Sequence, residues 1–326
     1  MADTNVHGRL TLRVQHAPVA GVALVAAGAA MWGLDGGLRA PLVTGSGPGW
    51  SAWTIVLYEH VILTALVLGH VVRHRGQLRR LDAAGWLSAI GIAWGGSAIA
   101  TLAFTDAFRY GNPDVVVLLQ KTQPLWAMGV ALVVVGERPR RAVGAFLVPA
   151  ALGTYLLSFG AISPSQAISD GRARGALEAL VAAALWGAAT AFGRRALRHL
   201  DSSVLTGLRF TLALPLLAAV ALVEGALGPP AGAASGDWVR LPLLALLPGL
   251  IAMLLYYRGL RTTPAPVATL AELAFPATAL IVNYVALGAT VDGAQILGFA
   301  ILWLTIAALH RLPVRVPVAT PSPQPA

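Results

Sequence analysis

The stretch "AMWGLDGGLRAPL", residues 30–42, has a counterpart late in the chain, "ALWGAATAFGRRAL", residues 184–197. Aligning the two brings Trp32 onto Trp186, and a glycine follows each tryptophan. Both stretches lie in largely apolar parts of the sequence. The match indicates that the chain consists of two related halves, and this repeat decides the predicted fold.

Two further pairs extend the repeat: "GWLSAI" aligns with "DWVRLP", and "LLQKTQP" aligns with "LAELAFP". The second pair brings Gln120 onto Glu272 and Pro124 onto Pro276 at a single offset. Each half thus has a polar residue four positions before a proline. A proline inside a helix removes the hydrogen bond to the carbonyl four residues earlier, so we expect kinks at Pro124 and Pro276.

The composition is that of an integral membrane protein. Of the 326 residues, 57% are hydrophobic and 11% are charged, whereas average protein usage includes about 25% charged residues. The mean hydropathy is +0.72. The net charge of +9 does not indicate a nucleic-acid partner, because the arginines fall in short groups between apolar runs rather than on one solvated face. The chain has no cysteine, which excludes disulfides, thiolate metal sites and cysteine nucleophiles.

A helix needs about 20 mostly apolar residues to cross about 30 Å of hydrocarbon. The first apolar run is too long for the core of a secretory signal, so we expect it to be retained. We predict a multi-pass protein of the cell (inner, cytoplasmic) membrane, with the lipid bilayer as a partner. The chain has ten candidate spans, near residues 18–38, 51–71, 83–105, 112–135, 142–161, 175–195, 202–223, 238–258, 264–287 and 292–310.

The arginines indicate how these spans are oriented. If the N-terminus is cytoplasmic, the inner side receives sixteen arginines and the outer side five, which favours cytoplasmic N- and C-termini by the positive-inside rule. The outer set is Arg39, Arg109, Arg172, Arg174 and Arg240. The inner set is Arg9, Arg13, Arg73, Arg75, Arg79, Arg80, Arg138, Arg140, Arg141, Arg194, Arg195, Arg198, Arg258, Arg261, Arg311 and Arg315.

The predicted fold class is an all-α membrane protein with ten transmembrane helices. The two halves are residues 18–162 and 163–310, flanked by an N-terminal cytoplasmic tail, 1–17, and a Pro-rich C-terminal tail, 311–326, that we expect to be disordered. Because five is odd, the second half enters the membrane from the side opposite to the first. The halves are therefore predicted to be inverted repeats, which are typical of secondary transporters with a solute site near the midplane.

With these motifs the chain resembles the drug/metabolite transporter superfamily, and within it the EamA type of ten helices. The resemblance covers about residues 18–310. It implies a solute carrier that alternates between inward and outward openings, with a central cavity lined by the first four helices of each half. No cofactor is expected, and the oligomeric state is left open. The motifs are the two Trp-Gly pairs, "FTDAFRYGNPDVVVLLQKTQP" (104–124), "GERPRR" (136–141) and "YYRGLRTTPAPVATLAE" (256–272).

Four charged residues lie well inside predicted spans: Glu59, Lys121, Arg209 and Glu272. Charges at membrane depth cost roughly 2.5 to 3.5 kcal/mol on insertion scales and usually face a partner or a water-filled path. Glu59 and Lys121 both sit about 12 Å below the outer surface, and Arg209 and Glu272 about 10 to 12 Å from the inner one. We therefore expect Glu59 to pair with Lys121, and Arg209 with Glu272.

Two interpretations of these pairs are open at the level of sequence: they are structural ion pairs, or at least one of them contacts the solute or couples protons. Lys121 is the only lysine, and a buried lysine can deprotonate whereas arginine effectively cannot. The candidates for proton coupling are Glu59, His60, Lys121 and Glu272. For His60 the alternative is packing or a hydrogen bond between helices.

The candidates for solute binding include aromatic residues. Trp32, Trp186 and Tyr58 can stack on a flat solute, although tryptophan in membrane proteins is as often an anchor at the interface. Asp35, near the outer end of the first span, either receives a cation or pairs with Arg39. The full set is Trp32, Asp35, Tyr58, Glu59, Gln120, Lys121, Trp186, Arg209 and Glu272.

The function predicted from the sequence is a secondary transporter that exports a small polar or zwitterionic metabolite, such as an amino acid or a derivative, by alternating access. One alternative is efflux of cationic drugs, with Glu59, Glu272 and Asp35 as acceptors. Another is an intramembrane enzyme that uses Glu59 or His60 for acid–base chemistry. The sequence has no nucleophile motif, metal-ligand spacing, phosphate loop or dinucleotide fingerprint, so neither an enzyme nor a metal site is predicted.

Overall fold

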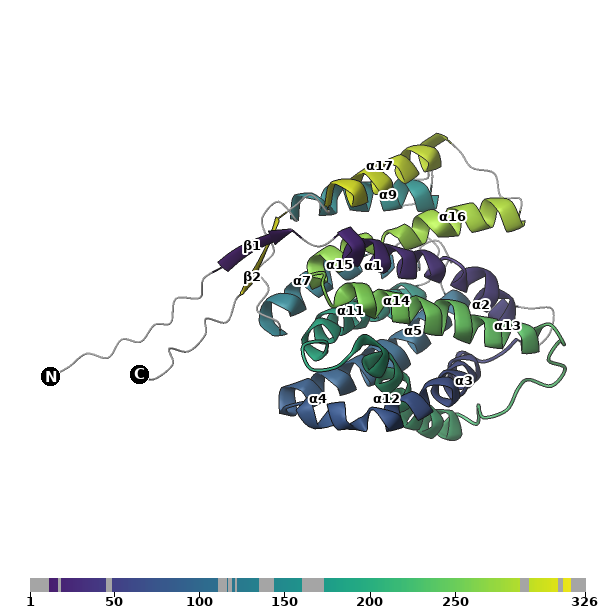
Figure 1. Cartoon of the computed structure of the whole chain (residues 1–326). Helices are drawn as coiled ribbons and strands as arrows, with labels where there is room; N and C mark the ends of the chain where they lie inside the picture. The colour runs from purple at the N-terminus through teal and green to yellow at the C-terminus, as the bar shows by residue number, and fades with distance from the viewer. Residues whose placement is uncertain are drawn as a thin grey trace, which may run out of the picture.

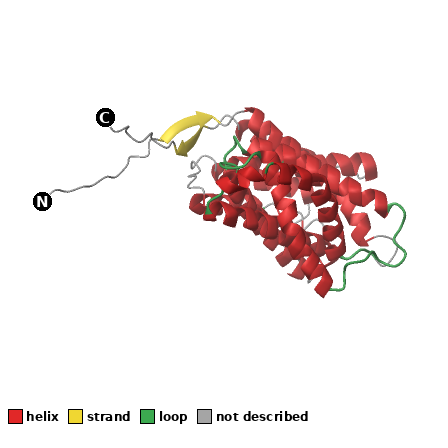
Figure 2. Ribbon diagram, turned by 60° about the horizontal axis from the view of Figure 1, so that its bottom comes forward, coloured by secondary structure: helices red, strands yellow, loops and turns green. Residues whose placement is uncertain are grey.

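The computed structural model is helical apart from one small two-stranded sheet, and the helices pack side by side in a bundle (Figures 1 and 2). It describes residues 12–16, 19–44, 49–110, 116, 119–120, 122–134, 144–159, 173–287, 293–309 and 313–317.

Six helices among the described residues are long and apolar enough to cross a membrane, and they match the first to third and sixth to eighth predicted spans. They are built from α1 (Val19–Trp32) with α2 (Asp35–Thr44); α3 (Ala52–Arg73); α4 (Ala83–Ile90), η2 (Gly91–Ile99) and α5 (Ala100–Tyr110); α11 (Ala173–Ala196); α12 (Ser202–Val223); and α13 (Asp237–Leu244), η3 (Ala245–Ile251) and α14 (Ala252–Leu260).

The remaining predicted spans correspond to shorter helices. These are α7 (Gln123–Val134), α9 (Leu147–Phe159), α15 (Ala265–Ala271), α16 (Ala274–Leu287) and α17 (Gly293–Leu309), and a short 3₁₀ helix, η1 (Arg75–Arg80), follows α3.

Local sequence signals fix where the long helices begin. The Ser51 hydroxyl accepts a hydrogen bond from the backbone N–H of Thr54 at 3.0 Å, and Asp82 accepts one from Gly85 at 2.7 Å. Such caps satisfy donors that a helix leaves unpaired in its first turn. The caps at Ser51 and Asp82 thus set the start of α3 and α4.

The third long helix of each half has a π-helical segment in its middle, η2 in the first half and η3 in the second. The offset that aligns Trp86 with Trp238 also places most of η2 on η3. Pro248 lies inside η3 and has no N–H to donate. Such π segments disturb the regular backbone hydrogen bonds and occur often at functional sites. The shared position of η2 and η3 therefore makes the middle of the bundle a candidate site.

Helices from the two halves interlock. α1 packs against α14 and α16, whereas α11 packs against η2, α5 and α7. α3 packs against α12, and α17 lies along α9 (Figure 1). The contacts of α1 with α14 and α16 correspond to those of α11 with α5 and α7 in the aligned repeats. The other two contacts, α3 with α12 and α9 with α17, join equivalent helices.

Two matched glycines permit close approaches between the halves. A Cβ atom at Gly33 would lie 2.9 Å from the backbone nitrogen of Ala279, and one at Gly187 would lie 2.8 Å from that of Ala127. Ala127 and Ala279 occupy the same position in the aligned repeats. Each half therefore uses its Trp-Gly motif to contact the proline-containing helix of the other half.

The structure corrects the expected proline kinks. α7 begins at Gln123 and α16 at Ala274, so Pro124 and Pro276 lie in the first turn of a helix and not in its interior. Proline is compatible with a first turn because that N–H has no partner there in any case. In the second half α15 ends before Glu272, whose carbonyl accepts from the backbone N–H of Phe275 at 3.0 Å. The acceptor expected to be free at Glu272 is therefore bonded, and the predicted kink is a break between two helices.

The two ends of the described chain meet. β1 (Leu12–His16) pairs antiparallel with β2 (Pro313–Pro317), with Leu12 opposite Pro317 and His16 opposite Pro313 (Figure 1). We expected a disordered tail from residue 311, but Pro313–Pro317 forms a strand. Its alternating valines favour an extended chain.

Candidate functional site

One buried charge cluster joins α2 to α3 and is built around Arg39. The Arg39 guanidinium donates to both carboxylate oxygens of Asp35, at 2.7 and 2.8 Å, and to Glu59 at 3.1 Å. It also donates to the Thr105 hydroxyl at 3.3 Å. Arg39 is 3% exposed and Glu59 is 6% exposed. A buried arginine between two carboxylates thus ties the first three spans together.

This cluster gives Glu59 a partner that was not predicted for it, and the predicted pairing of Glu59 with Lys121 stays a prediction. Glu59 binds Arg39, which the sequence had placed with the outer loops, and Asp35 takes the second of its two predicted roles as the partner of Arg39. Arg39 follows Asp35 by four residues, so both lie on one face of α2. Lys121 lies outside the described residues.

A second buried charge, Arg209 of α12, is held by neutral acceptors. Its Nε donates to the Ser97 hydroxyl at 2.6 Å and its Nη2 to the Gly96 carbonyl at 2.9 Å. Its Nη1 donates to the Tyr257 hydroxyl at 3.1 Å and lies 3.6 Å from the Met253 sulfur. The predicted pairing of Arg209 with Glu272 is therefore wrong, because every nitrogen of the guanidinium donates elsewhere. Equal depth in the membrane did not decide which side chains meet.

The π segment η2 supplies much of this arrangement. Gly96 and Ser97 both belong to η2, and the Gly96 carbonyl also accepts from the indole N–H of Trp186 at 2.9 Å. Trp186 thus bonds to the same oxygen as Arg209 and packs edge-on against Phe104, with ring centroids 5.1 Å apart. The predicted site residues Trp186 and Arg209 are brought together by a backbone atom that the sequence did not indicate.

Glu272 lies with glutamines from the first half. Gln123 donates to the Glu272 carboxylate, and Gln120 donates to Gln123 at 2.8 Å. Glu272 is 8% exposed and also interacts with Tyr256, whose hydroxyl is 2.8 Å from that of Thr190. The repeat predicted Gln120 and Glu272 as equivalents, and the structure brings them into one hydrogen-bonded group.

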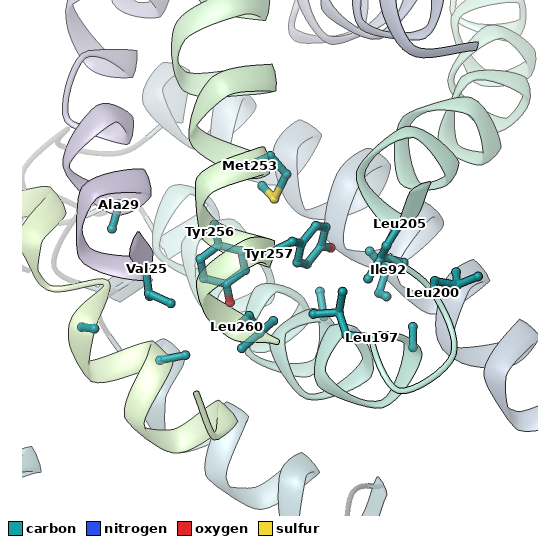
Figure 3. Packing of buried hydrophobic residues seen from close by; sticks show 14 of the residues in the cluster. Val25, Ala29, Ile92, Leu197, Leu200, Leu205, Met253, Tyr256, Tyr257 and Leu260 are labelled. Carbon is teal, nitrogen blue, oxygen red and sulfur yellow. The ribbon is translucent and has the colours of Figure 1, made fainter. Parts of the chain in front are cut away.

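Two adjacent tyrosines of α14 lie between Arg209 and Glu272. The rings of Tyr256 and Tyr257 are 5.5 Å apart, and Trp32 packs against Tyr256 at 5.2 Å. In Figure 3 Tyr256 points toward α1, near Val25 and Ala29, while Tyr257 points the other way, toward Ile92 and Leu205. Tyr257 thus contacts Arg209, whereas Tyr256 interacts with Glu272.

Tyr58 lies apart from this group. Its hydroxyl donates to the Leu227 carbonyl at 3.2 Å, and its ring packs with Trp50 and Trp238. Trp50 in turn donates to Asp237 at 3.0 Å. The structure therefore places Tyr58 in an aromatic cluster at the ends of α3 and α13, away from Arg209 and Glu272.

His60 faces the second half of the chain. Its Nδ1 is 2.9 Å from the Val56 carbonyl, and its ring packs edge-on against Phe210 of α12. Among the described residues, no partner bonds to His60 Nε2 or to the hydroxyl of Thr64, one turn further on, and both atoms are buried. The ring thus packs between helices, and a role of His60 in proton coupling stays a prediction.

Several members of the site were not singled out in the sequence. Ser97, Gln123, Tyr256, Tyr257 and Arg39 all contact a predicted residue. For Gln123 and the tyrosines a signal was available, because they belong to the motifs already quoted. Ser97 had none, since one serine in an apolar helix is unremarkable in sequence. No group of three or more histidines and acidic residues in the described parts of the chain is arranged to hold a metal ion.

Comparison with known proteins identifies the family. The model of the EamA-like transporter family matches this chain twice, over residues 19–159 and 173–310. The chain belongs to the EamA-like transporter family. Two matches to one family model also agree with the two related halves seen in the sequence. The chain is thus a multi-pass membrane transporter of the drug/metabolite transporter superfamily, and not an enzyme.

Two individual proteins are similar over most of their length. The riboflavin transporter ImpX of Fusobacterium nucleatum subsp. nucleatum is 29% identical over 297 residues, which cover 90% of this EamA-like chain and 98% of the relative. One crystal structure, 19% identical, covers 89% of this chain and 96% of its own with a TM-score of 0.69. That likeness shows a shared fold. The family match and the transporter relative show that this chain is a small-molecule transporter.

Proposed function

We propose that this protein is a secondary transporter of a flat, polar, heteroaromatic metabolite of the riboflavin kind. It works by alternating access between two inverted five-helix halves in the cytoplasmic membrane. The solute binds between the halves, where the Tyr256–Tyr257 pair lies between Arg209 and Glu272.

The matched contacts support the inverted arrangement. The Trp-Gly motif of each half approaches the proline-containing helix of the other, at equivalent alanines. The pairing of β1 with β2 brings the two ends of the chain together, which requires an even number of crossings. Ten spans with both termini in the cytoplasm meet this requirement and agree with the arginine bias.

One observation above all supports the site: buried groups of opposite charge lie on the two sides of one aromatic pair, and both halves contribute to them. Arg209, from the second half, is bonded to η2 of the first half. Glu272, also from the second half, is bonded to Gln123 of the first. Relative motion of the halves would change both groups of contacts at once, as alternating access requires.

The side chains present suit a flat polar solute. Trp32, Tyr256 and Tyr257 offer ring faces and edges, and stacked or edge-on aromatic contacts stabilise by about 0.5 to 1.5 kcal/mol beyond the buried area. Arg209 and the glutamines supply hydrogen bonds at the edge of such a ring. Riboflavin, which the relative's name gives as its solute, has a flat ring system with carbonyl and N–H groups along one edge.

Zwitterionic amino acids are the second candidate, because the same place holds a guanidinium and a carboxylate. A zwitterion would place its carboxylate at Arg209 and its ammonium at Glu272. Cationic drugs are a weaker candidate, because two of the carboxylates expected to bind them, Asp35 and Glu59, are both paired with Arg39. Export stays a prediction, and so do the roles of Lys121 and Glu59 in proton coupling.

Riboflavin binding to purified protein tests the solute class. We expect saturable quenching of riboflavin fluorescence, which excess alanine or leucine does not reverse. Trp32→Leu is expected to weaken binding about tenfold through the loss of an aromatic contact. Trp303→Leu is the control, because Trp303 is 43% exposed on α17. Absence of saturable quenching, together with binding of amino acids, would favour the zwitterion.

Oriented membrane vesicles test direction. We expect labelled solute to be taken up by inside-out vesicles in response to a proton gradient and to leave right-side-out ones. Uptake into right-side-out vesicles driven by the same gradient would indicate import.

A further inference from the structure

His60 and Thr64 belong to a stripe of α3 that packs against α12. The stripe consists of His60, Thr64, Val67 and Val71, which recur at spacings of four, three and four residues and so lie on one helix face. A Cβ at Gly207 of α12 would meet the Val71 side chain at 2.4 Å, and His60 packs on Phe210. Two of the four stripe residues are thus polar in a close contact between the halves.

Both polar atoms lack partners within the described part of the chain. His60 is 2% exposed and Thr64 is 7% exposed, yet His60 Nε2 and the Thr64 hydroxyl form no hydrogen bond there. Most threonine hydroxyls in these helices bond to a carbonyl one turn back, as Thr206 does to Ser202 at 2.8 Å. A buried polar group without a partner costs about 1 to 3 kcal/mol, so this pair calls for an explanation.

The hydrogen bond of the other ring nitrogen defines what His60 offers. The Val56 carbonyl can only accept, so Nδ1 is the atom that bears the hydrogen. A second proton at Nε2 would create a buried cation without a carboxylate bonded to it, which is costly at membrane depth. The neutral ring therefore presents a lone pair at Nε2, and Thr64 can accept beside it.

Arg209 lies on α12 near this stripe. It directly precedes Phe210, whose ring packs on that of His60. No carboxylate of the described residues forms an ion pair with Arg209; Glu59 acts on it only through space and binds Arg39. The Arg209 Nη2 carries two hydrogens, and among the described residues its bond to the Gly96 carbonyl uses one of them, so a second N–H is left for a solute carbonyl.

We propose that His60, Thr64 and Arg209 form a subsite for an imide-like edge, that is, an N–H next to a carbonyl group. The solute N–H donates to His60 Nε2 or to the Thr64 hydroxyl, and its carbonyl accepts from Arg209. The proposal rests on the proposed solute class and adds which edge of the ring is recognised. A solute that lacks this N–H is rejected because the acceptors then stay buried and unpaired.

The first test needs no ligand. Thr64→Val replaces the unpaired hydroxyl by a methyl group of the same shape, and we expect the midpoint of thermal unfolding of the ligand-free protein to rise by about 2 °C. Thr206→Val is the matched control, because its hydroxyl is bonded, and it is expected to give no rise. A lower midpoint for Thr64→Val would overturn the proposal, since it would show that the hydroxyl already has a partner, such as a bound water.

The second test uses riboflavin and riboflavin methylated at the ring N3, which removes the N–H between its two carbonyls. We expect wild-type protein to bind riboflavin about tenfold more tightly than the methylated analogue. His60→Leu should shrink this ratio to about twofold, while His60→Gln, which keeps an acceptor near Nε2, should largely preserve it.

The outcomes separate the two proposals. An unchanged ratio in His60→Leu overturns the subsite but leaves the solute class intact. If wild-type protein does not bind riboflavin at all, the solute class fails, and the ligand-free comparison of Thr64→Val with Thr206→Val alone decides the subsite.

Discussion

Arg39 shows how this chain tolerates charge in the membrane. A buried carboxylate without a partner is costly, and Arg39 satisfies two at once, Asp35 and Glu59. That trio has a net charge of −1, and the nearby Arg209 brings the group of four to zero. Charge is thus balanced over the group, although only Arg39 makes ion pairs within it among the described residues.

Removing Arg39 alone should be severe. Arg39→Gln leaves the buried Glu59 carboxylate and the half-buried Asp35 carboxylate without their shared partner, and we expect it to lower the free energy of unfolding by about 3 kcal/mol. The measurement is chemical unfolding in detergent. The double variant Arg39→Gln with Glu59→Gln should recover part of the loss, because one of the stranded charges is gone. Equal losses in the single and double variants would show that Glu59 is not a true partner.

Arg209 should not be replaceable by lysine. A lysine ammonium is a compact point charge, whereas the planar guanidinium reaches Ser97, the Gly96 carbonyl and Tyr257 together. Arg209→Lys is expected to weaken riboflavin binding about tenfold. Arg240→Lys, at the ion pair with Asp237 near the end of the bundle, serves as control. Unchanged binding in Arg209→Lys would mean that charge alone suffices at this position.

At this scale the sequence predicted which residues lie in buried polar contacts better than which residues meet. Trp186, Arg209, Gln120 and Glu272 all lie in polar networks of the bundle interior. Their partners were assigned by depth, which ignores the rotation of each helix about its axis and the length of each side chain. Arg39 is the clearest example. It was counted with the arginines of the outer side, yet its side chain is buried in the bundle.

Among the elements, the Trp-Gly motifs are points of close contact between the halves. At Gly33 and Gly187 a Cβ would fall within 2.9 Å of backbone atoms, which cannot move as a flexible side chain can. This explains in physical terms why glycine follows the matched tryptophans.

Alanine at either glycine should therefore destabilise the protein. We expect Gly33→Ala and Gly187→Ala each to lower the free energy of unfolding by roughly 1 to 3 kcal/mol through overpacking. Gly69→Ala in α3 is the control, because no atom lies within 4 Å of its Cβ position and alanine favours helix. Thermal unfolding in detergent measures all three. Equal midpoints for Gly33→Ala and Gly69→Ala would refute the close approach.

The sequence predicted the two related halves better than it predicted the individual helices and strands. It placed the six long helices and the polar level of the two prolines. It predicted a kink at Pro276, where the structure has a break between α15 and α16. A proline near the start of a new helix and a proline inside one long helix are hard to tell apart in the sequence. The π segments η2 and η3 have no reliable sequence signature, and the strand Pro313–Pro317 depends on pairing with residues 12–16 at the other end of the chain.

Across the whole molecule, polar contacts tie the bundle at both ends. At one end Gln77 donates to Asp201 at 2.7 Å and accepts from its backbone N–H at 3.0 Å. At the other, Trp50 donates to Asp237 at 3.0 Å. In the alternating access that we propose, one of these ends opens while the other stays closed. Each tie therefore favours closure of its own end.

Weakening the Gln77–Asp201 contact and weakening the Trp50–Asp237 contact should each open a different end of the bundle. The chain has no cysteine, so Met253→Cys provides a single reactive thiol beside Arg209. With Gln77→Ala we expect faster labelling of this thiol by a membrane-impermeant maleimide from the Asp201 side. With Trp50→Phe, which keeps the ring but loses the N–H, we expect faster labelling from the Asp237 side. Equal rates from both sides in both variants would exclude a gating role for these ties.

The measurement that tests the central claim most directly is riboflavin counterflow in proteoliposomes. Vesicles containing the protein are loaded with unlabelled riboflavin and diluted into labelled riboflavin. We predict transient accumulation of label in vesicles with wild-type protein, a rate at least tenfold lower with Arg209→Gln, and no accumulation in vesicles loaded with alanine and leucine instead. Accumulation that depends on the amino acids and not on riboflavin, or an unchanged rate with Arg209→Gln, would contradict a flat-solute site at Arg209.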